Sequence, residues 1–235
     1  MQWASFCLGG GRLGVGRCLG FLLRGWQMNV GLRERVYALD AAQNLMVVAC
    51  ANKAVALFDV RNPAQPIREM ESPLRFQTRD VSVFLDGAMF VLASIEGRCF
   101  VRHSDARIDG QDHSGSFPFK CHRRDGENKG QQVFAVNVVK CNPTERYKEV
   151  FITAGSDGSF VNWHKSKKLR LDEPRSASKV PITAVSWAPT GVSFAYAHGY
   201  DWHQGAAGDN KAANPVSIHI HNCSKDELVP PRGGY

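Results

Sequence analysis

The sequence predicts an all-β fold, and three features of the chain lead to that prediction. From residue 32 onward, short runs rich in valine, isoleucine and phenylalanine alternate with turns that contain Gly, Asn, Asp or Pro. No segment shows a sustained apolar period of about 3.6 residues, which an amphipathic helix would require. The runs form units that begin near residues 35, 81, 133 and 182, a spacing of about 45–50 residues. The chain is therefore predicted to repeat one small β-sheet unit four times.

The first two units each contain three predicted strands, with a tight turn between the second and the third. Asn52-Lys53 forms this turn in the first unit and Glu96-Gly97 forms it in the second. Each unit is thus expected to be a meander of neighbouring strands. The predicted strands cover residues 35–40, 45–51, 54–60, 81–84, 89–94 and 98–102.

The third unit has the sharpest turn signal, because Asp157-Gly158 tolerates the positive φ angles of a hairpin turn. Trp163 ends the following strand and has a ring large enough to pack between sheets. His164 comes next, where WD repeats commonly have Asp. The strands of the last two units cover residues 133–139, 150–155, 159–164, 182–187, 193–197 and 216–221. This period is the one expected for β-propeller blades of four strands each.

Three segments fall outside the predicted strands. Residues 1–28 contain seven glycines, three arginines and no acidic residue, so we predict a poorly ordered, atypical N-terminus there and a partial propeller over 29–235. An organellar presequence is the alternative, but glycine at this density opposes the helix that such a signal needs. Residues 103–131 and 199–215 are predicted to be loops that project from a propeller face and carry either solvated or binding residues.

Composition excludes several classes of protein. Hydrophobic residues make up 43% of the chain, enough for a packed core, so disorder, collagen and coiled coil are excluded. Charge or glycine interrupts every apolar run before the roughly 20 residues that a membrane helix needs. The seven cysteines are widely spaced and contain no CxxC pair, which favours free thiols in a reducing compartment and no zinc site.

The sequence gives no sign of catalysis. It contains no GxSxG, HExxH, GxxxxGK[ST] or dinucleotide-binding pattern. A metal site near Cys121 and His122 is not expected, because these adjacent residues point to opposite faces of an extended strand. The nearby His103, Asp112 and His113 complete no compact zinc spacing either. We predict no enzyme, no metal and no cofactor.

Six motifs occur in an order and spacing that resemble one known family. They cover residues 71–79, 93–98, 119–123, 135–137, 155–158 and 195–202. The chain resembles the messenger-RNA export factor of the nuclear pore, a Gle-type WD-repeat nucleoporin. The Bub-type mitotic checkpoint WD-repeat protein is a sister family with similar motifs. Features that favour the export factor are Ser72-Pro73-Leu74, Tyr200-Asp201-Trp202, Gly205 and Asn214-Pro215.

The resemblance implies an incomplete propeller and a binding site. The family has seven blades, and this chain corresponds to about the four C-terminal ones. Family propellers bind an acidic hairpin, the Gle-binding sequence of an FG nucleoporin, and Arg98 and Arg123 match positions that pair with its glutamates. A guanidinium grips a carboxylate through two parallel hydrogen bonds. Lys120 is expected to add a carboxylate or phosphate contact, and Phe119 to be a buried anchor or a surface contact.

A second surface is implied around Trp163. Similar family positions engage RNA or proteins that mimic it, since a ring stacks on a base and cations neutralise phosphates. The rival interpretation is a core tryptophan followed by a solvated basic turn. The basic residues of this predicted surface are Lys165, Lys167, Lys168 and Arg170.

The predicted function is a non-catalytic adaptor in nuclear export of messenger RNA. Its expected partners are an FG nucleoporin with a Gle-binding sequence and messenger RNA or ribonucleoprotein, without membrane insertion. Its expected location is the nucleus and the nuclear pore, with shuttling to the cytoplasm. One alternative is a spindle-checkpoint scaffold that binds acidic motifs in checkpoint kinases or tubulin-associated factors. The other is a protein that binds single-stranded RNA directly.

Overall fold

The computed structural model describes residues 6–8, 17–23, 26–104, 115–126, 130–210 and 215–231, and only the backbone before Val30. Asp112, His113 and Asn214 lie outside the described residues. A first sheet contains β1 (Phe6–Leu8), β2 (Arg17–Leu23) and β3 (Trp26–Leu32). This sheet crosses the boundary predicted at residues 28 and 29, and that division of the chain stays a prediction.

Four antiparallel sheets follow, one for each predicted unit, and they are called the first to the fourth blade in chain order. The first has β4 (Val36–Ala42), β5 (Leu45–Cys50), β6 (Ala54–Asp59) and β7 (Arg68–Glu71). The second has β8 (Thr78–Val83), β9 (Met89–Ser94), β10 (Arg98–His103) and β11 (Phe117–Lys120). The third has β14 (Val136–Cys141), β15 (Val150–Gly155), β16 (Phe160–His164) and β17 (Leu169–Arg170). The fourth has β18 (Ile182–Trp187), β19 (Ser193–His198) and β20 (Ser217–Asn222).

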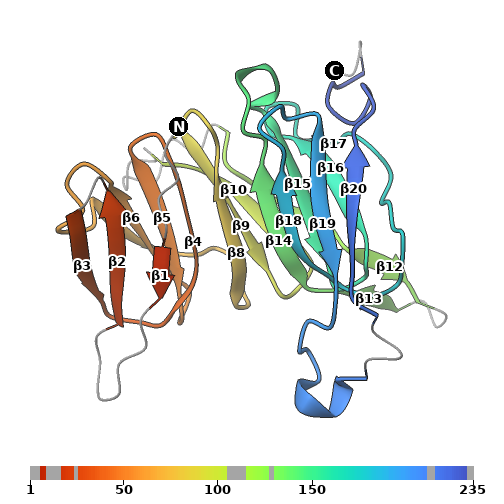
Figure 1. Cartoon of the computed structure of the whole chain (residues 1–235), viewed down its shortest axis with the longest axis horizontal. Coiled ribbons are helices and arrows are strands. Elements are labelled where there is room, and N and C mark those ends of the chain that lie inside the picture. Colours follow the sequence, from red (N-terminus) through yellow and green to blue (C-terminus); the bar gives the residue numbers. More distant parts are fainter. Residues whose placement is uncertain are drawn as a thin grey trace.

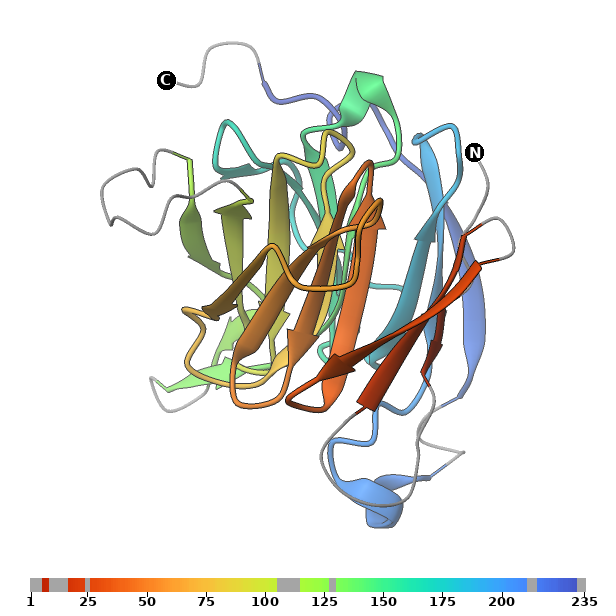
Figure 2. The ribbon, with the colours of Figure 1, turned by 90° about the vertical axis from the view of Figure 1, so that its left-hand side faces the viewer.

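The sheets stand side by side in an arc that does not close (Figure 1). The β1–β3 sheet lies at one end and β20 at the other, and Figure 2 shows the successive sheets one behind another. This arrangement confirms the prediction of an all-β, incomplete propeller. A short hairpin of β12 (Arg123–Asp125) and β13 (Gln131–Val133) leads from the second blade to the third.

Apolar side chains fill the space between consecutive sheets. All six residues of β5, of β9 and of β15 are buried, because these strands are covered on both faces. Separate core clusters join the first blade to the second, the second to the third and the third to the fourth. Val30 and Leu32 of β3 pack on the first blade with Met46, Val48 and Phe58. The arc is therefore held together mainly by burial between blades.

The innermost strands repeat the same irregularity. A β-bulge interrupts the pairing of each inner strand between Val36 and Ala38, Thr78 and Asp80, Val136 and Val138, and Ile182 and Ala184.

Polar side chains also join neighbouring inner strands. Asp40 Oδ2 accepts hydrogen bonds from Ser82 Oγ and Val83 N, both at 2.8 Å. Asn137 Nδ2 donates to the Ile182 carbonyl at 3.0 Å. These bonds fix the position of each blade relative to the next.

The segment 103–131 differs from the predicted loop. It contains β11 and β12, because Phe117 and Phe119 turn inward while Pro118 and Lys120 stay exposed, a pattern that suits an outer strand. The segment 199–215 contains only the short helix η2 (Gly205–Gly208) among its described residues, in keeping with a loop. The other short helix, η1 (Glu145–Tyr147), lies between β14 and β15. No helix in the described ranges is long and apolar enough to cross a membrane.

Candidate partner-binding site

The turn between β9 and β10 presents the first candidate residue. Gly97 has a φ of +62°, and a Cβ at this position would lie 2.8 Å from the Cys121 carbonyl oxygen. A residue with a side chain does not fit this position without a shift of the backbone. Arg98 follows at once as the first residue of β10.

Arg98 and Lys120 lie directly opposite each other. They are paired in the register of β10 and β11, and both side chains reach solvent. The Nε of Arg98 is 3.7 Å from Glu96 Oε2, a long ion pair between partly exposed groups. Such a contact contributes little stability, so it offers weak competition to an incoming carboxylate.

Arg123 lies at the same turn but has several partners within the chain. Its Nε donates to the Gly97 carbonyl at 3.2 Å and its Nη2 to the Glu96 carbonyl at 2.8 Å. Its Nη1 donates to Gln131 Oε1 at 2.9 Å. The structure thus brings the predicted Arg98, Lys120 and Arg123 together. Arg123 also stabilises the turn that precedes Arg98.

Phe119 faces the core between the second and third blades. Its ring centroid lies 4.5 Å from that of Trp163 and 5.9 Å from that of Phe151. Phe119 is half-buried and packs against this core, and its contact with a partner stays a prediction.

Trp163 ends a chain of hydrogen bonds that sequence reasoning missed. Its Nε1 donates to Thr153 Oγ1 at 2.9 Å, and Thr153 Oγ1 is 3.0 Å from His122 Nε2. His122 Nδ1 is 2.9 Å from Asp157 Oδ1. This series of hydrogen bonds joins β15, β16, the turn after β15 and the end of the second blade. It agrees with the rival interpretation of Trp163 as a core residue, and stacking of its ring on a base stays a prediction.

His122 and Asp157 shift each other's protonation. Burial opposes a charge on His122, but its hydrogen bond to Asp157 and the charge of that carboxylate raise its pKa. Burial works against the Asp157 carboxylate as well, yet the bonds from His122 and Ser159 hold its pKa below 3.8. Both ring nitrogens of His122 have protein partners.

The basic residues predicted to form a surface after Trp163 are partly buried and partly exposed. Lys165 is only 6% exposed; its Nζ lies 2.8 Å from Asp86 Oδ2 and 4.4 Å from the Phe84 ring centroid. The structure thus places Lys165 inside and not on the expected surface, because a carboxylate and a ring from the second blade enclose it. Arg170 pairs with Glu173. Lys167 and Lys168 are exposed, in the turn between β16 and β17.

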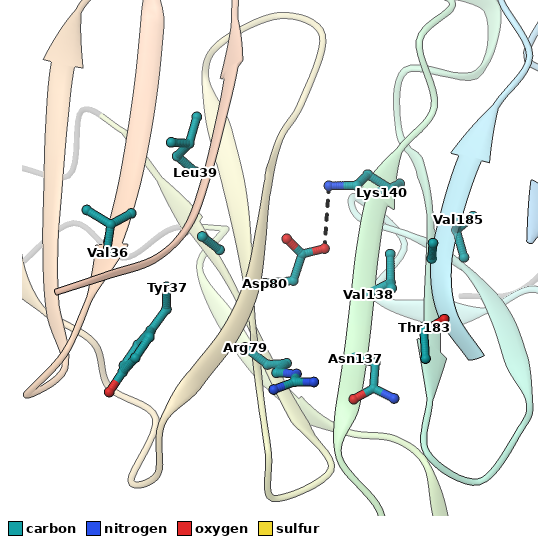
Figure 3. A pocket seen from close by; sticks show the side chains of 12 residues that line it. Val36, Tyr37, Leu39, Arg79, Asp80, Asn137, Val138, Lys140, Thr183 and Val185 are labelled. Carbon is teal, nitrogen blue, oxygen red and sulfur yellow. Dashed lines mark ion pairs between the residues drawn. The ribbon is translucent and has the colours of Figure 1, made fainter. Parts of the chain in front are cut away.

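A hollow of about 430 Å³ lies on the inner face of the arc (Figure 3). Residues of the inner strands β4, β8, β14 and β18 line it, and none of the predicted site residues is among them. Asp80 Oδ2 is 3.4 Å from Lys140 Nζ and accepts a bond from Val139 N at 3.0 Å. Asp80 and Lys140 neutralise each other across the two blades. The residues that line the hollow therefore do not form a recognisable catalytic set.

Comparison with known proteins agrees with the fold and the motifs. The chain is 37% identical over 201 residues to "mRNA export factor GLE2" of Chaetomium thermophilum, which covers 86% of this chain and 54% of that protein. It is 37% identical over 204 residues to "Protein RAE1" of Arabidopsis thaliana, covering 86% and 55%. It is 40% identical over 190 residues to "WD40 repeat protein poxJ" of Penicillium oxalicum, covering 80% and 52%. No protein-family model matches.

A solved structure supports the architecture alone. The β-propeller domain of Cps50 (Swd1) from Myceliophteria thermophila superposes with a TM-score of 0.60 at 10% identity, over 88% of this chain and 66% of that one. The chain spans about half the length of the curated relatives it matches. The repeated blades, the motifs and these identities together show that the chain is similar to WD-repeat mRNA export factors of the Gle type.

Proposed function

We propose that the chain is a non-catalytic adaptor in the export of messenger RNA, and that the second blade captures an acidic hairpin of an FG nucleoporin at the nuclear pore. The names of its relatives support a role in export. The proposal includes a nuclear location with shuttling to the cytoplasm.

The observation that carries the proposal is the grouping of Arg98, Lys120 and Arg123 at one end of the second blade. Arg98 and Lys120 reach solvent from opposite strands, while Arg123 holds the turn between them. Arg98, Lys120 and Arg123 together form a site of positive charge, and the strands of the second blade present it. An acidic peptide that replaced the long contact to Glu96 would gain a charge-assisted hydrogen bond.

Contact with RNA is assigned to the exposed turn that contains Lys167 and Lys168. Lys165 does not add to it, because Asp86 and Phe84 enclose this side chain. Arg170 is exposed, and its ion pair with Glu173 joins two exposed side chains, so Arg170 remains part of the proposed surface. Replacing both lysines with Glu is expected to lower RNA retention and to leave hairpin capture unchanged. RNA binding should also weaken steeply with salt, whereas a packed hairpin interface should lose less.

The test of the adaptor function is Arg98→Glu, measured by titration with a synthetic acidic hairpin peptide. Reversing a charge in an interface pair is expected to weaken binding at least about 30-fold. Lys148→Glu is the matched control, since Lys148 is also exposed and paired with a nearby glutamate but lies at the other end of the strands. The affinity of the Lys148→Glu variant for the hairpin peptide should stay within about twofold of wild type.

Thermal melts of both variants show whether the fold is intact. Wild-type affinity in a folded Arg98→Glu variant would contradict the proposed site. Equal losses in both variants would point to a general effect of charge and not to capture by the second blade.

A further inference from the structure

A cluster of three different ligand types lies at the end of β20, outside the site described above. His221 belongs to the strand, Cys223 follows it, and Glu227 lies in the turn that folds back onto it. One ligand atom of each residue lies within 4.8 Å of those of the other two. Imidazole nitrogen, thiolate sulfur and carboxylate oxygen together are the donor set of zinc sites.

The surrounding structure holds these groups in place. The Glu227 side chain is 1% exposed, and its Oε2 accepts a bond from Ser224 N at 2.6 Å. His221 Nε2 lies 3.0 and 3.1 Å from the two carboxylate oxygens of Glu227. The His221 ring packs against Phe160 and Phe194, with centroids 5.0 and 5.1 Å away. Little rearrangement is therefore needed to bring His221 and Glu227 onto one ion.

A second buried carboxylate lies beside the cluster and shares a cation with Glu227. Asp172 lies between β17 and β18, its side chain is 5% exposed, and its Oδ2 is buried without a hydrogen bond. This oxygen is 3.6 Å from Arg175 Nε, which also contacts Glu227 Oε1 at 3.0 Å, so the two carboxylates lie on one guanidinium. Asp172 therefore adds negative charge beside the cluster, but it is not one of the residues whose ligand atoms lie within 4.8 Å of one another.

We propose that His221, Cys223 and Glu227 bind Zn²⁺, with a water molecule as the fourth ligand. Binding replaces the hydrogen bond between His221 and Glu227 with bonds to the metal and releases the Cys223 thiol proton to water. The negative charges of the Cys223 thiolate, Glu227 and the neighbouring Asp172 then balance the two charges of the ion and the charge of Arg175.

The position of the site explains why the sequence predicted none. The cysteine is single and has no CxxC partner, and Glu227 approaches His221 only because the turn after β20 folds back. The bound ion would join this C-terminal turn to the edge strand of the last blade. The competing interpretation is a metal-free ion pair between protonated His221 and Glu227.

The test is titration of the chelator-treated full chain with Co²⁺, followed by competition with Zn²⁺. Wild type should show a thiolate-to-cobalt charge-transfer band that Zn²⁺ removes. Cys223→Ser should abolish the band and weaken Zn²⁺ binding at least about 100-fold, beyond the effect of losing an outer-shell residue. His219→Gln is the matched control: it alters a histidine two residues away that stacks on Tyr196, and it should bind as wild type does.

A measurement on wild type alone guards against a variant that fails to fold. X-ray absorption of the zinc-loaded chain should show one sulfur at about 2.3 Å. Absence of that sulfur, or equal Zn²⁺ affinity of wild type and Cys223→Ser, would overturn the site and leave the metal-free ion pair.

Discussion

The Thr153 hydroxyl takes part in hydrogen bonds that join two blades. Its Oγ1 contacts both Trp163 Nε1 and His122 Nε2, and through His122 the bonds reach Asp157. The residues come from two blades, so a loss at Thr153 disturbs the packing between them as well as one hydrogen bond.

Thr153→Val should lower the free energy of unfolding by about 2–4 kcal/mol, because it leaves two polar groups without a partner. Urea denaturation measures this change. Thr183→Val is the control: Thr183 is exposed on β18 and makes one weak bond at 3.4 Å, so its effect should stay within about 0.5 kcal/mol. Similar losses for the two variants would contradict the role of the hydrogen-bond chain.

The His122–Asp157 pair should make stability depend on pH. The pKa of His122 is raised above 6.5 in the folded state, so its contribution is complete below pH 6.5 and is lost as pH rises through the folded pKa. The pKa of Asp157 is lowered below 3.8, so its contribution is lost as pH falls below that value. The pair should therefore stabilise the fold most between about pH 4 and 6.5.

The measurement is the urea midpoint of wild type and Asp157→Asn at pH 5.5 and 8.5. The difference between the two proteins should be larger at the lower pH. A difference that does not change with pH would show that the carboxylate acts only as a hydrogen-bond acceptor.

At the scale of elements, the tight turns were predictable and the outer strands were not. Asn52 and Lys53 both have positive φ, and Gly97 and Gly158 occupy the same left-handed region. By contrast, β7 and β17 are short and partly exposed, with sequences Arg-Glu-Met-Glu and Leu-Arg that lack an alternating apolar pattern. They form because a neighbouring strand offers unpaired backbone groups.

Gly158→Ala should be strongly destabilising. Gly158 has a φ of +74°, and an added Cβ would press on the Ser178 carbonyl oxygen and lie 2.7 Å from that of Val180. We expect a loss of more than about 2 kcal/mol, from both strain and the displaced backbone. Gly130→Ala, where nothing lies within 4 Å of the added atom, should change stability by less than about 0.5 kcal/mol. Thermal melts of both variants check this, and an undisturbed Gly158→Ala would contradict the geometry of the turn.

At the scale of the whole molecule, the open arc leaves one face of the last blade uncovered. Val216, Ile218 and Ile220 are 81%, 76% and 78% exposed. In the part of the chain that the structure describes, no strand pairs with the outer edge of β20. An apolar stripe beside a free strand edge favours association.

Replacing Ile218 and Ile220 with Lys should therefore reduce self-association of the chain without lowering its melting temperature, because neither side chain is packed. Sedimentation velocity over a range of protein concentrations measures the effect. Ile67→Lys alters another isoleucine, 63% exposed and outside the stripe, and should leave association unchanged. Equal behaviour of wild type and the double variant would mean that the stripe does not drive association.

The sequence by itself determined the repeat of four units, their inner strands, the turns between them and the resemblance to Gle-type export factors. These features depend on residues close together in the chain: alternation along a strand, and Gly, Asn or Asp where φ is positive. The family motifs also indicated Arg98, Lys120 and Arg123, which the fold brings together.

The tertiary structure alone decided what several of these side chains do. Arg123 holds a turn 26 residues away, Lys165 is enclosed by a residue 79 positions before it, and Arg175 pairs with Glu227 from another blade. Such partners are set by how the sheets pack against one another. No local pattern encodes that packing, because a charged residue reads the same in a sequence whether it faces water or a partner from the next blade.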